Sequence, residues 1–157
     1  MTILIFLHGT IIMHQSGIGK TREERVVQSL NQEESVLNFD SYVPIGNAVA
    51  KLNGWQQQGF EIIYLSSHES ETCVKKDKMV LKKFGFPTGQ ILYRKNGEKY
   101  KDIAERIVPD ILIEDDCESI GGADEMVITH IDPEIKKKIR LMVVKEFEGI
   151  DNLPDKF

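Results

Sequence analysis

Five short apolar runs, separated by helical patterns, constrain the fold of this chain more than any other feature. The runs are Ile3–Leu7, Ile62–Leu65, Ile91–Tyr93, Ile111–Ile113 and Met126–Ile128. Their apolar residues are continuous instead of alternating with polar ones, which is typical of strands covered on both faces. Strands that alternate with helices form right-handed crossovers. The sequence therefore predicts an α/β fold: a three-layer, Rossmann-like parallel sheet of about five strands with helices on both faces.

The boundaries of the first two helices are indicated by glycine, proline and capping residues. An apolar stripe over Ile45–Trp55 predicts one helix, with Pro44 in its first turn and Gly59 after its end. Ser66–Glu69 has the form of a capping box, which predicts a second helix that continues to Gly85.

The rest of the chain contains shorter and less regular patterns. Another stripe predicts a helix over Tyr100–Ile107, and Asp132-Pro133 begins a short last helix, after which Leu141–Phe147 looks extended. The 157 residues fit one domain. Within it, residues 11–43 are too long for an ordinary loop, and only the part from Arg22 to Leu37 has helical content. We interpret residues 11–43 as a small insertion over the mouth of a site.

Charge and cysteine usage exclude several classes of partner. A net charge of −5 gives no electrostatic attraction to nucleic acid or to an anionic membrane. No apolar run approaches the ~20 residues that a bilayer span needs. Cys73 and Cys117 are far apart and form no metal-type pair, which favours a reduced, cytoplasmic setting.

Two familiar catalytic patterns are incomplete. Gly17–Thr21 resembles the end of a nucleotide-binding P-loop, but His14 stands where that motif needs its first glycine. Ser67, His68 and a distant aspartate could be considered for a serine hydrolase, but the Gly-x-Ser-x-Gly elbow of many such enzymes is missing.

Polar groups follow three of the predicted strands. They are His8-Gly9-Thr10, Ser66-Ser67 and Glu114-Asp115-Asp116. In open α/β sheets, ligands bind beyond the carboxyl ends of the strands. We therefore expect His8, Ser66 and Asp115 to converge on one site.

Each of these groups has a chemical use and a plainer alternative. Gly9 allows close approach of backbone amides to an oxyanion, or it simply makes a turn. Ser66 and Ser67 could bind an anion at a helix N-terminus, cap the helix, or do both. Asp115 and its neighbours suit Mg²⁺, or form a solvated acidic turn. Lys101, with Lys99 as its rival, could reach a phosphate or lie on the surface.

Taken in order, these stretches resemble the haloacid dehalogenase-like superfamily. The resemblance rests on Phe6–Ile11, Tyr64–Ser67, Lys101 and Asp110–Asp116, and it covers the chain to about Ile131. It implies a phosphatase fold in which Thr10, Ser66 and Lys101 hold a phosphate while Asp115 and Asp116 hold Mg²⁺. In that family an aspartate ending the first strand attacks phosphorus, and a second one, two residues later, acts as acid and base.

This chain lacks both of those aspartates. Phe6 occupies the nucleophile position and His8 the acid/base position. Phenylalanine cannot attack phosphorus, whereas histidine can exchange protons near neutral pH. One hypothesis is a phosphate or phosphometabolite pocket with lost or strongly reduced phosphohydrolase activity. An alternative is an active Mg²⁺-dependent phosphomonoester hydrolase that uses His8 as base. A structural role, with chains pairing as a homo-oligomer through the segment after Leu141, is a third.

Overall fold

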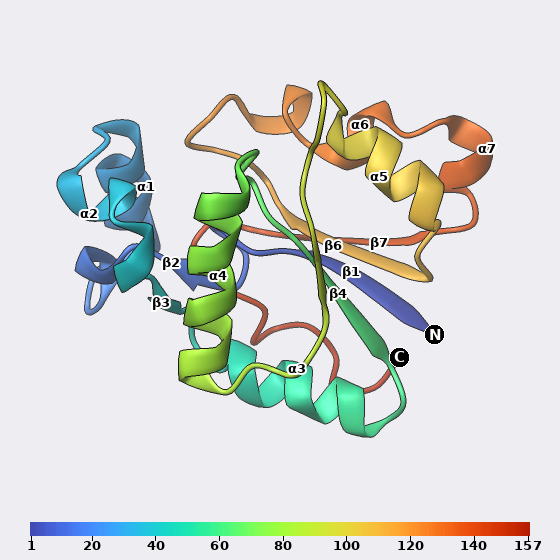
Figure 1. Cartoon of the computed structure of the whole chain (residues 1–157), viewed down its shortest axis with the longest axis horizontal. Coiled ribbons are helices and arrows are strands. Elements are labelled where there is room, and N and C mark those ends of the chain that lie inside the picture. Colours follow the sequence, from blue (N-terminus) through green and yellow to red (C-terminus); the bar gives the residue numbers. More distant parts are fainter.

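A five-stranded parallel sheet forms the centre of the structure, a computed structural model that describes residues 1–157 (Figure 1). Its strand order is β5-β4-β1-β6-β7, with every neighbouring pair parallel. The strands are β1 (Thr2–Phe6), β4 (Glu61–Leu65), β5 (Gln90–Leu92), β6 (Ile111–Asp115) and β7 (Arg140–Val144). The predicted α/β class and parallel sheet are confirmed, and β1 lies in the middle.

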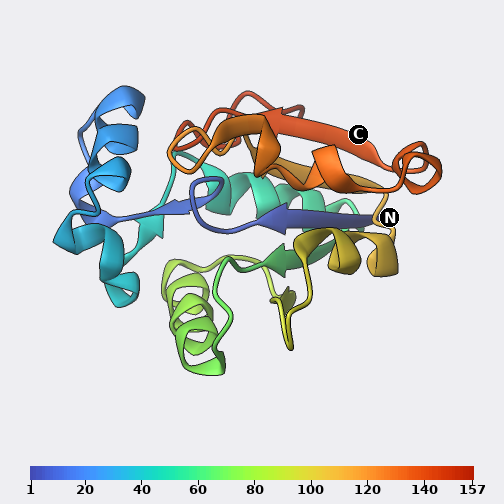
Figure 2. The same ribbon diagram turned by 90° about the horizontal axis from the view of Figure 1, so that it is seen from above.

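Successive side chains of β1 point to opposite faces of the sheet and belong to two separate hydrophobic clusters. Ile3 and Ile5 belong to the larger cluster, whereas Leu4 lies in the smaller one on the opposite face, with Phe6 packed against it. The first face is covered by α3, α4 and the C-terminal tail, and the second by α5, α6 and α7 (Figures 1 and 2). The helices are α3 (Ala48–Gln57), α4 (Glu71–Phe84), α5 (Tyr100–Ile107), α6 (Val127–His130) and α7 (Pro133–Lys136). None of the helices is both long and apolar enough to span a bilayer.

The predicted fifth strand is in the wrong place. Met126–Ile128 is not a strand, because α6 begins at Val127, where the Glu114 side chain accepts hydrogen bonds from the amides of Val127 and Ile128. The fifth strand is β7, which lies mostly in the tail predicted to be extended. A buried carboxylate that caps a helix gives no signal in a local hydrophobic pattern.

Two helix starts are also corrected. Pro44 is not in a first helical turn: it lies in the short strand β3 (Val43–Pro44), and α3 begins only at Ala48. Ser66–Glu69 does not form a capping box, because the cap of α4 is Ser70, whose side chain accepts from the amide of Cys73. The predicted helix ends near Gly59, at Gly85 and at Ile107 are confirmed.

Residues 11–43 leave the sheet after β1 and lie beyond its carboxyl end (Figure 2). Two arginines attach this segment to the loop after β7. Arg22 Nε donates to the carbonyl oxygen of Glu146 at 3.0 Å, and Arg25 Nη1 donates to that of Phe147 at 2.8 Å. The segment contains β2 (Ile12–Met13), η1 (Gln15–Gly17), α1 (Arg22–Leu30), α2 (Glu34–Leu37), η2 (Phe39–Ser41) and β3.

We predict that Trp55→Ala lowers the free energy of unfolding by about 3–5 kcal/mol. Trp55 is fully buried against the sheet, its Nε1 donates to the carbonyl oxygen of Pro154, and its ring lies 5.0 Å from that of Phe157. Urea unfolding measures the change. Gln57→Ala, on an exposed position of the same helix, is the control and should leave stability nearly unchanged. Equal losses in the two variants would contradict the packing described here.

Candidate functional site

A pocket of about 640 Å³ opens at the carboxyl ends of the strands. Its floor comes from Phe6, His8 and Gly9 after β1, and from Ser67 after β4. Asp115 of β6 and Glu146 after β7 contribute the acidic side. The polar groups that follow separate strands therefore do converge.

Phe6 places an aromatic ring at the end of the central strand. The ring lines the pocket and packs edge-on against Tyr100 of α5, with centroids 5.2 Å apart. This contact ties the ring to the smaller hydrophobic cluster. No oxygen that could attack a substrate is supplied at this position.

The turn after β1 brings the backbone against the acidic residues. Gly9 has φ +78°, and a Cβ there would lie 3.1 Å from Asp115 Oδ2. The Gly9 amide donates to the carbonyl oxygen of Ile12 at 2.9 Å, so the turn itself uses it. Thr10 is fully buried, and its Oγ1 donates to Asp115 Oδ2 at 2.7 Å. The threonine thus fixes a carboxylate and does not line the pocket.

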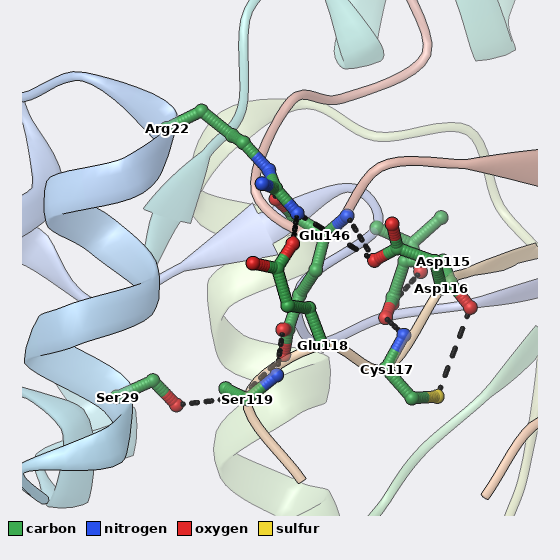
Figure 3. A network of polar contacts seen from close by, with 9 residues as sticks. Arg22, Ser29, Asp115, Asp116, Cys117, Glu118, Ser119 and Glu146 are labelled. Carbon is green, nitrogen blue, oxygen red and sulfur yellow. Dashed lines mark hydrogen bonds and ion pairs between the residues drawn. The ribbon is translucent and has the colours of Figure 1, made fainter. Parts of the chain in front are cut away.

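Asp115, Asp116 and Glu146 form an acidic cluster whose ligand atoms lie within 4.8 Å of one another (Figure 3). Asp115 Oδ1 accepts from the Cys117 amide at 2.9 Å, and Asp116 Oδ1 accepts from the Glu146 amide at 3.0 Å. Ser119 donates to both Glu146 oxygens, at 2.6 and 2.7 Å. These bonds hold the three carboxylates close to one another.

Burial disfavours the negative charge of these carboxylates, so a cation close to them would stabilise their ionised forms. Burial raises the pKa of Asp115 and of Glu146 above their ordinary values, although hydrogen bonds oppose the shift at both residues. Arg22 supplies one cation, with Nη2 3.7 Å from Asp116 Oδ1 and a contact to Glu118 (Figure 3). Three carboxylates are hard oxygen donors, so the cluster could also hold a metal ion.

Of the three consecutive acids after the fourth predicted strand, Glu114 lines the pocket but lies outside the acidic cluster. Both carboxylate oxygens of Glu114 accept hydrogen bonds from amides at the start of α6, and burial raises its pKa to about 7. The third carboxylate beside Asp115 and Asp116 is that of Glu146, which the sequence analysis missed. The available signal was its position near the end of the segment predicted to be extended, because a fifth parallel strand must end at this same edge.

Basic side chains line another part of the pocket. Arg94, Lys99 and Lys101 all line it. Arg94 pairs with Glu69 at 2.8 Å and lies over the Tyr100 ring, whereas neither lysine has an ion-pair partner. Both lysines considered from the sequence thus reach the pocket, and their charges are unpaired in the protein.

A second polar cluster consists of His8, Ser66, Ser67 and Asp77. His8 Nδ1 and Ser67 Oγ are 2.7 Å apart, and His8 Nε2 lies 2.9 Å from Asp77 Oδ1. Ser66 is fully buried and donates to Asp77 Oδ2 at 2.6 Å, so it faces Asp77 and not the pocket. His8, His68 and Asp77 form another group that could hold a metal ion.

The sequence analysis also missed Asp77 as a candidate site residue. It lies on the buried side of α4 with Val74, Val80 and Leu81, and its own exposure is 1%. A carboxylate within an apolar helical stripe needs buried partners. That pattern was the signal that the sequence carried.

Comparison with known proteins supports the fold alone. No protein-family model matches the chain, and no curated protein matches its sequence. Among solved structures, the Pnkp1/Rnl/Hen1 complex contains a chain with a TM-score of 0.58 and 16% identity. The match covers 92% of the present chain but 46% of the other, and in a second structure of this RNA repair complex 42%. The chain therefore spans less than half the length of those proteins.

A class C acid phosphatase from Bacillus anthracis, solved with tungstate bound, has a TM-score of 0.60 and 14% identity. That match covers 94% of the present chain and 68% of the phosphatase. At 14% identity the match carries over no site residue. The chain thus shares its overall α/β fold with that phosphatase, as the resemblance described above led us to expect.

Proposed function

We propose that this protein binds inorganic phosphate or a phosphorylated small molecule in the pocket, with phosphohydrolase activity lost or strongly reduced. The observation that carries the proposal is the Phe6 ring at the tip of the central strand, in a pocket that otherwise keeps charged groups of both signs. Covalent catalysis through an aspartyl-phosphate has no nucleophile there.

The phosphate would lie near the unpaired lysines. Lys101 and Lys99 supply positive charge, and Ser67 lines the same pocket. Gly9 and Thr10 act indirectly in this proposal, since they shape the turn and fix Asp115. Ser66 likewise acts through Asp77.

A small ligand fits better than a macromolecule. The volume of about 640 Å³ is within the range of small-molecule sites. The net charge of −5 disfavours nucleic acid, so we do not extend the RNA repair role of one structural neighbour to this chain. Ser29, Val36 and Tyr42 of residues 11–43 line the same pocket, which supports our proposal that this insertion covers the site and selects the ligand.

Mg²⁺ is the cation that the acidic cluster fits best in this proposal. Asp115 and Asp116, joined by Glu146, offer only carboxylate oxygens, and two of the three are buried. Phe6 contributes no ligand, so the central strand gives no carboxylate to the set. When bound, Mg²⁺ would supply positive charge that offsets both the carboxylates and a phosphate.

The first test of phosphate binding is Lys101→Ala. We expect the dissociation constant for inorganic phosphate, measured by isothermal titration calorimetry, to rise about tenfold or more because a charge-assisted hydrogen bond is lost. Lys78→Ala removes the same charge from an exposed position of α4 outside the pocket and serves as control. Equal affinities in the two variants would rule out this location for the phosphate.

Metal binding is tested by thermal unfolding. We expect MgCl₂ to raise the unfolding midpoint relative to NaCl of the same ionic strength, because a ligand of the folded state stabilises it. Asp115→Asn should remove that increase, whereas Asp155→Asn, at a side chain 91% exposed, should keep it. An increase that survives Asp115→Asn would place the cation elsewhere.

A second function is favoured by one observation, the bond between His8 and the buried Asp77. An oriented imidazole could act as base for direct attack by water on a phosphomonoester. In assays with p-nitrophenyl phosphate and Mg²⁺, our main proposal expects weak or absent turnover. Robust turnover that Asp115→Ala abolishes would contradict it, and turnover that His8→Ala abolishes without a phospho-enzyme would support this second function.

A further inference from the structure

Ser67, His8 and Asp77 form a continuous hydrogen-bonded chain from the pocket into the interior. The Ser67 hydroxyl is exposed at the pocket, 2.7 Å from His8 Nδ1. His8 Nε2 in turn lies 2.9 Å from Asp77 Oδ1, and Asp77 is 1% exposed. A nucleophile, a base and a group that orients the base occur in this order in serine hydrolases of several folds.

The hydrogen bonds of Asp77 suggest one tautomer of His8. In the arrangement that we assign, Asp77 Oδ1 accepts from His8 Nε2–H while Oδ2 accepts from Ser66 at 2.6 Å. A neutral His8 that carries its proton on Nε2 has a free lone pair on Nδ1. The Ser67 hydroxyl therefore donates to Nδ1, the arrangement in which a serine can lose its proton to the base.

Packing keeps the His8 imidazole in this orientation. Its ring lies edge-on to Tyr42, at a centroid distance of 5.6 Å, and to His68, at 4.6 Å. His68 itself is not the base, because its Nε2 lies 3.6 Å from Asp77, and among its hydrogen bonds none joins it to Ser67. The sequence analysis considered His68 beside Ser67, whereas the histidine within hydrogen-bond distance of the Ser67 hydroxyl is His8.

We propose that Ser67 is a nucleophile that replaces the missing aspartate, with His8 as general base and acid and Asp77 as the positioning residue. The parallel register pairs Phe6 with Leu65, so Ser67 follows the neighbouring strand by two residues and opens into the pocket that Phe6 lines. The substrate class, a phosphomonoester, rests on the proposed phosphate site with Lys101. The inference identifies the residue through which any remaining turnover passes.

The reaction balances without a further reactant other than water. Ser67 Oγ bonds to phosphorus as its proton passes to His8 Nδ1, the ester P–O bond breaks, and the leaving alcohol takes that proton. Water then attacks the phosphoserine and gives a proton to His8. The bond between phosphorus and Ser67 Oγ breaks, the serine regains the proton, and inorganic phosphate leaves.

The test uses a fluorophosphonate probe, which labels activated serines without requiring the natural substrate. We expect mass spectrometry to locate the label on Ser67, and we expect His8→Gln and Asp77→Asn to slow labelling by about 100-fold or more. Ser41→Ala, which removes another hydroxyl outside the pocket, should label at the parental rate. Labelling that persists in Ser67→Ala, or none in the parent protein, would overturn the proposal.

A structural effect of Asp77→Asn is separated from a positioning effect by ¹⁵N NMR of the His8 ring. We expect the parent to carry the proton on Nε2 and the variant to lose this preference, because the amide can donate to the ring. Ser67→Ala changes an exposed side chain and keeps the test valid if the buried variant fails to fold. Unchanged ring signals in a folded Asp77→Asn would contradict the assigned role of Asp77.

Acid quench during turnover of p-nitrophenyl phosphate completes the test. A phosphoserine at Ser67 supports the proposal, and hydrolysis that continues at the same rate in Ser67→Ala overturns it. Phosphate binding by the parent protein, measured separately, reports on the proposed function alone. Binding without a reactive Ser67 refutes only the nucleophile, whereas a reactive Ser67 without phosphate binding refutes the phosphomonoester as substrate.

Discussion

The pairing of β1 with β4 on one side and β6 on the other is the constraint on which the site depends. Parallel pairing brings the carboxyl ends of all three strands to one edge, so residues more than a hundred positions apart in sequence come into contact. Thr10 and Asp115 show the result, with a buried hydrogen bond of 2.7 Å between the turns that follow β1 and β6. Both faces of β1 are buried, and the strand is paired on both sides. Its carboxyl end is therefore fixed in position, and the pocket lies against it.

The two polar clusters at this edge have different chemical character. Asp115, Asp116 and Glu146 present oxygen atoms only, and Arg22 already compensates part of their charge. The cluster around His8 combines imidazole, hydroxyl and one buried carboxylate in a hydrogen-bonded chain. The first suits a cation and the second suits proton transfer, and the pocket lies against both.

Much of the fold followed from pattern, but some of its parts could not. The buried strands, the stripe of α3 and the stop at Gly85 are local properties, so hydrophobic periodicity and glycine conformation predicted them. The start of α6 depends on Glu114, which comes from β6. The short strand that contains Pro44 depends on pairing with Ile12, a contact between distant residues. No local window of sequence contains either partner.

The candidate site was predictable to a similar extent. Strand ends predicted that His8, Ser66 and Asp115 would converge, and His8 and Asp115 do line the pocket, whereas Ser66 is buried and its neighbour Ser67 lines the pocket in its place. Asp77 and Glu146 depend on how α4 packs on the sheet and on which tail segment forms the fifth strand. Sequence order alone therefore predicted the location of the chemistry better than its hydrogen-bond partners.

Arg22 has a consequence for how such a protein can diverge. Its guanidinium connects α1 to the carbonyl oxygen of Glu146 and lies near Asp116. One side chain therefore contributes both to the placement of residues 11–43 and to the charge of the acidic cluster. Replacement of the insertion by another, to admit a new ligand, would also change the electrostatic balance of the neighbouring carboxylates. The position of residues 11–43 and the charge around Asp116 are thus not independent in this structure.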